Sequence, residues 1–193
     1  MEVVNIMTEP VARHPQNQPW TFEDLADLPV DGDRYELFDG SLLVSPSPAV
    51  PHLDTVYRLR RRLEAQAPAH LAVVENAGLL VREGRSFFVP DLTVVPVAAL
   101  DRPDASLKAP DGLLVVEVLS KSNAGCDLVV KRHEYAVGGI PQYWMVSRDE
   151  RTLTVLTRPG PDEGYLDCVV VAAGERFETD DPFAISLDPA DFC

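Results

Sequence analysis

The chain has 193 residues, of which 46% are hydrophobic, and it carries a formal net charge of −14. This length supplies one hydrophobic core and little material for a second, so we expect a single domain. The negative charge repels polyanions at long range and excludes proteins that coat nucleic acid through a broad basic face, although a local basic groove is compatible with it.

Neither a membrane span nor a signal peptide is indicated, because the chain has no run of about eighteen apolar residues and its N-terminus lacks a basic segment followed by an apolar one. The cysteines Cys126, Cys168 and Cys193 lie far apart, without a Cys-x-x-Cys pair. This spacing argues against a disulfide framework or a structural zinc site. We therefore expect a cytoplasmic protein with no membrane contact.

The first third of the chain predicts an arm, a short helix and a hairpin. Residues 1–20 contain several prolines among polar residues and are interpreted as an N-terminal arm, followed by a single domain at 21–193. Thr21 is suited to the N-cap of a short helix that ends at Pro29. The dipeptide Asp39-Gly40 separates two apolar segments and favours the tight turn of a β-hairpin.

Next, apolar residues recur at helical spacing and predict a helix at about 52–67. Four arginines of this helix are interpreted as a solvated face or, alternatively, as phosphate contacts: Arg58, Arg60, Arg61 and Arg62. The β-branched and aromatic segments 71–76, 79–83 and 87–97 predict successive strands. Pro90 removes a ladder donor, so we expect the third of these strands to be irregular beside Asp91.

Residues 113–146 form the most informative stretch. An apolar strand interrupted by Glu117 is followed by a helix from Asp127 to Val137, a stop at Gly138-Gly139 and an aromatic strand. A hairpin is expected beyond it, between residues 152–159 and 165–172, and the acidic tail from Glu175 has weak strand signals.

Asp91 and Glu117 each interrupt an apolar strand. A buried carboxylate needs a partner, a proton or a metal ion, because the desolvation of an isolated charge costs several kcal/mol. Two such carboxylates on neighbouring strands can bind one divalent cation, and we expect Mg²⁺, with Mn²⁺ as its substitute. Lys131, with Tyr135 on the same helix face, could orient or deprotonate a water molecule beside that cation.

A set of motifs then carries a family resemblance: VPDLTVV, LLVVEVLS, DLVVKRHEYAVGGIPQYWMV, YELFDG and a proline-rich turn that runs into His52. In their order and spacing they resemble the Uma-type putative restriction endonuclease family, a branch of the PD-(D/E)XK nuclease superfamily, over about residues 21–190. The resemblance implies an α/β (α+β) fold with a restriction-endonuclease-like core, in which helices flank a mixed β-sheet.

The same resemblance implies that Asp91 and Glu117 are the metal-binding acids and that Glu36 assists them. The superfamily's lysine would fall at position 119, which is Leu119 here, and the family branch places it on the following helix, at Lys131. Lys121 is the alternative lysine, and His52 and Tyr135 are secondary site candidates. The implied function is Mg²⁺-dependent endonucleolytic cleavage of DNA by a homodimer.

Several alternatives remain open from the residues alone. Asp91 is also compatible with a turn, Glu117 with a buried ion pair with Lys131 without metal, Glu36 with a bond to the hairpin backbone, and His52 with a helix-start or packing role. The whole chain could also be a catalytically silent binding or regulatory protein with a nuclease fold. If DNA binds, the cations expected nearest the site are Arg58, Arg61, Arg62, Lys121, Lys131 and Arg132.

Overall fold

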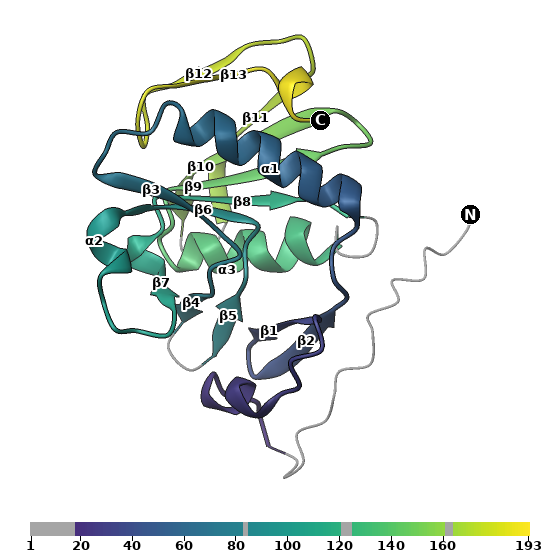
Figure 1. Cartoon of the computed structure of the whole chain (residues 1–193), viewed down its shortest axis with the longest axis vertical. Coiled ribbons are helices and arrows are strands. Elements are labelled where there is room, and N and C mark those ends of the chain that lie inside the picture. Colours follow the sequence, from purple (N-terminus) through teal and green to yellow (C-terminus); the bar gives the residue numbers. More distant parts are fainter. Residues whose placement is uncertain (1–17, 83–84, 121–124, 161–163) are drawn as a thin grey trace.

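The computed structural model describes residues 18–82, 85–120, 125–160 and 164–193. Its largest sheet has six strands in the order β11–β10–β9–β8–β6–β3 (Figure 1). These strands are β3 (Leu71–Glu75), β6 (Leu92–Pro96), β8 (Leu114–Val118), β9 (Gln142–Ser147), β10 (Thr152–Gly160) and β11 (Gly164–Ala172). Only β8 and β9 run parallel among these neighbours, so the sheet is mixed, as predicted.

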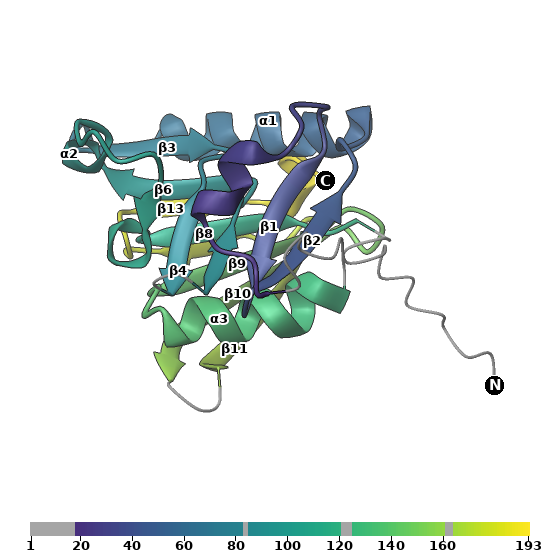
Figure 2. The same ribbon diagram turned by 90° about the horizontal axis from the view of Figure 1, so that it is seen from below.

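Helices cover both faces of this sheet. In Figure 2, α1 (Val50–Glu64) lies on one side of the strands and α3 (Arg132–Val137) on the other. The buried face of α1 carries the predicted helical repeat, at Val56, Leu59 and Leu63. The flanked mixed sheet confirms the predicted fold class.

The connection between β8 and β9 differs from the prediction in one detail. We expected one regular helix from Asp127 to Val137, whereas the structure has a π-helix, η3 (Cys126–Lys131), that continues into α3. A π-turn places one more residue in the turn than an α-turn does, and such turns are frequent at functional sites. Lys131 is the last residue of this π-helix.

A smaller sheet, with strand order β2–β1–β5–β4–β7, packs beside the large one. Its strands are β1 (Arg34–Phe38), β2 (Ser41–Ser45), β4 (Leu79–Arg82), β5 (Ser86–Phe88) and β7 (Leu107–Lys108). The predicted hairpin joins β1 to β2, and Asp39 and Gly40 have φ values of 47° and 77°, as its turn requires.

Alternation along β1 divides its side chains between two environments. Tyr35 and Leu37 pack in a cluster with Trp20 and Phe87, whereas Phe38 joins the core beneath the large sheet. Because side chains alternate along a strand, Arg34 and Glu36 share the face of Phe38. This face of β1 is therefore directed toward the large sheet.

The remaining elements are short: η1 (Glu23–Asp27), α2 (Val97–Leu100), η2 (Ala109–Asp111), β12 (Phe177–Thr179), β13 (Ile185–Leu187) and η4 (Pro189–Asp191). The helix predicted after Thr21 is the 3₁₀ turn η1, and Thr21 donates to Asp24 Oδ2 from both its amide (2.7 Å) and its hydroxyl (2.8 Å). The weak strands of the tail pair as β12 and β13. Within the described ranges, no helix is long and apolar enough to cross a membrane.

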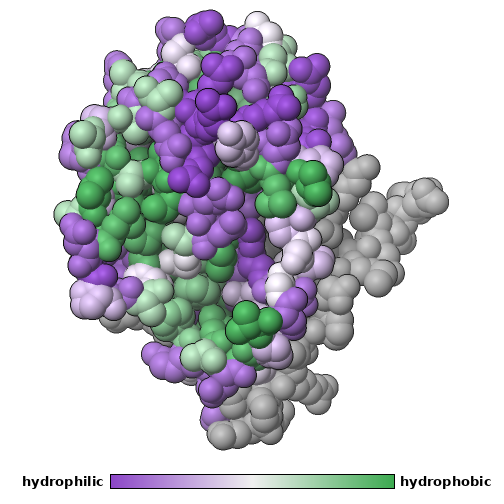
Figure 3. Space-filling model, viewed as in Figure 1, coloured by the Kyte–Doolittle hydropathy of each residue, from purple (hydrophilic) through white to green (hydrophobic). Residues whose placement is uncertain are grey.

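Figure 3 shows one face of the molecule in the view of Figure 1. Hydrophilic residues gather along α1 and above it, and hydrophobic residues lie below it. The exposed face of α1 carries charged residues together with the exposed hydrophobic residues Val50, Leu53 and Tyr57, while its opposite face packs on the sheet.

The close packing of the C-terminal end of α3 gives a test of the fold. A Cβ on Gly138 would lie 2.7 Å from Val81 Cγ1 and 3.2 Å from Ala109 Cβ. We expect Gly138→Ala to lower the free energy of unfolding by about 1–3 kcal/mol, because overpacking forces neighbouring atoms apart. Gly125→Ala is the matched control, since no atom lies within 4 Å of its added Cβ. Equal stability of the two variants in urea denaturation would contradict this packing.

Candidate active site

The strand register brings Asp91 and Glu117 together. Leu92 of β6 pairs with Val116 of β8, and Thr93 pairs with Val115. Asp91 lies one residue before this register begins, and its Oδ2 accepts from the amide of Val118, the residue after Glu117. Asp91 and Glu117 are each only 2% exposed.

Asp91 lies where regular pairing stops, between the end of β5 and the start of β6. Its Oδ1 accepts from Arg34 Nη2 (3.2 Å) and lies 3.0 Å from His52 Nε2, while its Oδ2 accepts from the Val118 amide (2.7 Å). Burial acts to raise the pKa of Asp91, but His52, Arg34 and the Val118 amide together outweigh it and hold this pKa below its ordinary value. Asp91 is therefore a carboxylate at neutral pH.

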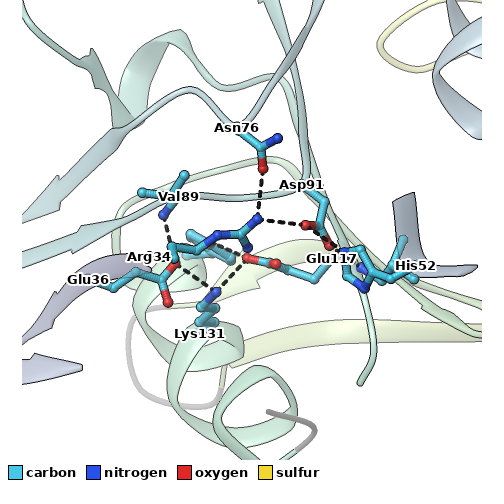
Figure 4. A network of polar contacts seen from close by, with 10 residues as sticks. Arg34, Glu36, His52, Asn76, Val89, Asp91, Glu117 and Lys131 are labelled. Atoms are coloured by element: carbon cyan, nitrogen blue, oxygen red, sulfur yellow. Dashed lines mark hydrogen bonds and ion pairs between the residues drawn. The ribbon is translucent and has the colours of Figure 1, made fainter. Parts of the chain in front are cut away.

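Lys131 joins Glu117 to Glu36, as Figure 4 shows. Its Nζ lies 2.9 Å from Glu117 Oε1 and 3.0 Å from Glu36 Oε1, and its side chain is 3% exposed. The same ammonium lies 5.6 Å from the centre of the Phe88 ring, within the range of a cation–π contact. The structure thus brings Glu36, Glu117 and Lys131 into one buried group.

Tyr135 fixes the orientation of Glu117 from the same helix face as Lys131. Its hydroxyl donates to Glu117 Oε1 at 2.9 Å. Burial, followed by the charges of Glu117 and Glu36, raises the pKa of Tyr135 well above its ordinary value. The phenol therefore keeps its proton and remains a hydrogen-bond donor.

Arg34 is a site residue that the sequence analysis missed. Besides Asp91, its Nη2 contacts Asn76 Oδ1 at 2.7 Å. Burial acts to lower the pKa of Arg34, but the charges of Asp91, Glu117 and Glu36 outweigh it and raise this pKa, so the guanidinium stays charged. A signal for Arg34 was present, because two-residue alternation on the predicted first strand places it on the face of Glu36.

The expectation about the nearest cations needs correction. Arg34 contacts the acids directly, whereas Arg58 and Arg62 are exposed and paired with Asp54 and Asp191. They lie about 9–15 Å along the α1 axis from His52, at the usual helical rise. Regular helix geometry carries them away from the site, although His52 begins the same helix.

The other predicted cations of that set have different places. Arg61 lies over the Tyr57 ring at 5.7 Å, and Arg132 Nε is beside Gly164 at the start of β11. The alternative lysine, Lys121, lies outside the described residues. Among the predicted cations that the structure describes, Lys131 is the one that contacts the acids Glu36 and Glu117.

The geometry decides only in part between a site role and a structural role for Glu117, Glu36 and His52. The ion pair between Glu117 and Lys131 is present. Glu36 bonds backbone, but at the amide of Val89 (2.7 Å), beyond β5 rather than in its own hairpin. His52 is near the start of α1 and also contacts Asp91.

A hollow of about 800 Å³ opens beside the acids. Arg34 and His52 form one wall, the segment from Ser45 to Ala49 forms another, and residues of β9 and β10 complete the lining. This volume lies in the range of ligand-binding clefts. The hollow adjoins the buried cluster through Arg34 and His52, both of which contact Asp91.

The carboxylate oxygens of Asp91 and Glu117 are suitable ligands for a hard divalent cation such as Mg²⁺. Asp91 and Glu117 belong to neighbouring strand segments, and the charges of both act on Arg34. Mg²⁺ is usually bound by one or two carboxylates together with water and substrate phosphates. In the described part of the chain, no three His, Cys, Asp or Glu residues form a ready metal cluster. The protein would thus supply two carboxylates, and the remaining ligands would come from water and substrate.

The sequence was also compared with known protein families. Residues 22–190 match the Uma2 family model, described as "Putative restriction endonuclease". The chain belongs to this family. The resemblance predicted from the motifs is therefore confirmed, and the match covers both candidate metal-binding acids and Lys131.

A solved structure shares the fold of this Uma2 family member. It is the crystal structure of a putative nuclease belonging to DUF820 from Anabaena variabilis ATCC 29413, with a TM-score of 0.71 and 17% identity over 90% of this chain and 97% of that one. At this identity the likeness shows the fold. No curated protein matches the sequence significantly. The homodimer and the cytoplasmic location stay predictions.

Removal of the Lys131 charge should destabilise the fold strongly. Lys131→Met leaves Glu36 and Glu117 buried without their shared cation, and we expect a loss of about 3–5 kcal/mol in the free energy of unfolding. Lys108→Met, at an exposed lysine, is the control and should change this energy by less than about 0.5 kcal/mol. If urea denaturation shows the two variants equally stable, the buried cluster does not constrain the fold.

Proposed function

We propose that this protein is an endonuclease that hydrolyses DNA phosphodiester bonds with Mg²⁺ held by Asp91 and Glu117. The observation that carries the proposal is the pair of buried carboxylates on neighbouring strands of a Uma2 family member, with Lys131 on Glu117 and with Arg34, which contacts Asp91, at the wall of an open hollow. Water would be the nucleophile, so no covalent intermediate with the protein is needed.

The surrounding residues have separable tasks. When bound, Mg²⁺ would lower the pKa of a water molecule and stabilise charge that develops on the phosphate. Lys131 keeps a positive charge beside Glu117 and can orient the attacking water, and Tyr135 holds the Glu117 carboxylate in one orientation. Glu36 holds the Lys131 ammonium from the opposite side.

Arg34 and His52 act around Asp91. Arg34 is charged and lines the hollow, so it can contact a phosphate oxygen, for which its planar donors are well suited. His52 Nε2 holds Asp91 Oδ1 from the N-terminal end of α1. These contacts orient the carboxylate before substrate binds.

Neutral substitutions of the two acids test the proposal. We expect Asp91→Asn and Glu117→Gln each to reduce Mg²⁺-dependent cleavage of plasmid DNA at least about 100-fold, which corresponds to about 2.7 kcal/mol of lost transition-state stabilisation. Glu75→Gln, on strand β3 of the same sheet, is the control and should retain the wild-type rate. Cleavage at the wild-type rate by either acid variant would contradict the assigned site.

A second candidate function is supported by the charge balance of the cluster. The chain's own Arg34 and Lys131 pair with its carboxylates, and Leu119 occupies the superfamily's lysine position. These features favour a nuclease fold kept for binding or regulation. Wild-type protein that binds DNA but cleaves neither single strands nor duplexes with Mg²⁺ or Mn²⁺ would support this candidate over the nuclease.

A further inference from the structure

A second hollow, of about 590 Å³, adjoins the first at Arg34. Its wall includes three aromatic residues, Phe22, Tyr35 and Phe87, and further residues among which are Pro48, Asn76 and Ala105. Arg34 and Pro48 line both hollows, so the two meet beside the acid cluster.

We propose that this second hollow binds an unpaired nucleobase next to the phosphate that the acids engage. The substrate would then enter as a single strand, or with one base turned out of the duplex. The inference rests on the proposed nuclease function and adds the substrate class to it.

Arg34 supplies the link between base and phosphate. Its guanidinium is 3.2 Å from Asp91 Oδ1 and donates to Asn76 Oδ1, and both Arg34 and Asn76 are lining residues of the second hollow. A phosphate held at this guanidinium therefore places its own nucleoside, or the next one, at the mouth of the hollow. One nucleotide has both features: its phosphate is the anionic group that would lie at Arg34, and its base is the flat apolar group that would lie beside it in the hollow.

The lining chemistry favours a base over a second phosphate. In the described part of the chain, Arg34 and Asp33 are the charged residues of the lining, and their charges oppose each other. The Phe22 and Phe87 rings lie 5.0 Å apart, and the Tyr35 hydroxyl is held by Asp31 Oδ2 at 2.9 Å. Stacking of a base on such rings contributes about 1–3 kcal/mol to the free energy of binding, and every type of base can stack in this way.

A paired base inside a duplex cannot reach the hollow without leaving its stack. Turning it out costs a few kcal/mol, and an unpaired base avoids this cost. We therefore expect tighter binding of single strands than of duplexes.

The test combines protein variants that change the hollow with DNA strands that carry or lack a base. Ala105 is exposed and lines the hollow, so Ala105→Leu adds apolar atoms there, while Ala98→Leu adds the same atoms on α2, outside the lining. Binding of labelled 12-nucleotide strands to the full chain is measured by fluorescence anisotropy in EDTA, with a normal strand and with an abasic strand of equal length. Phe22→Leu is a second variant, which removes a ring but keeps apolar volume.

We expect Ala105→Leu and Phe22→Leu each to weaken binding of the normal strand about tenfold and to leave binding of the abasic strand unchanged, because the lost stack is worth about 1.4 kcal/mol. Ala98→Leu should match wild type for both strands. A duplex of the same sequence should bind wild type more weakly than the single strand does.

Equal binding of the normal strand by wild type and both hollow variants would overturn the inference, as would an equal loss for the abasic strand. If Ala105→Leu instead only lowers the mass in light scattering, the hollow belongs to contacts between copies of this chain, and the inference is overturned. The cleavage assay separates the two proposals. Cleavage without a base-dependent effect leaves the nuclease and removes the base site, whereas a base-dependent effect without cleavage leaves a binding site for single strands and removes the nuclease.

Discussion

The rest of this structure depends on the ion pairs that Lys131 makes with Glu36 and Glu117. Each of the three residues belongs to a different part of the fold: Glu36 to β1 of the small sheet, Glu117 to β8 of the large sheet and Lys131 to the helical connection. Buried charges of this kind are stable only while all partners are present. The packing of the small sheet and the helix against the large sheet is therefore coupled to one ammonium group.

Asp91 extends the same arrangement to α1. Pro90 stops the regular ladder, so the Asp91 carboxylate can accept from the Val118 amide and contact Arg34 and His52. Elements that are distant in sequence thus converge on one buried polar cluster between two surface hollows. A cluster whose ion pairs and hydrogen bonds must all be formed for folding is also held in one geometry, as the proposed chemistry requires, which links the stability of the chain to that proposal.

Much of the fold could be predicted from the sequence. Alternation and turn residues located the strands and the β1–β2 hairpin, and the conflict of Glu117 with its apolar strand identified the site. The contact of Arg34 with Asp91 joins residues 57 positions apart and depends on how the small sheet packs, which local patterns do not encode. The π-helix that ends at Lys131 was not predictable either, because its apolar spacing is also compatible with a regular helix.

A crystal structure of the full chain in Mn²⁺, with anomalous diffraction data, tests the central claim most directly. We predict an anomalous peak bounded by the carboxylates of Asp91 and Glu117 in wild type, and no peak at this place in Glu117→Gln. Wild-type crystals with Arg34 still paired to Asp91 and no peak between the two carboxylates would contradict the account.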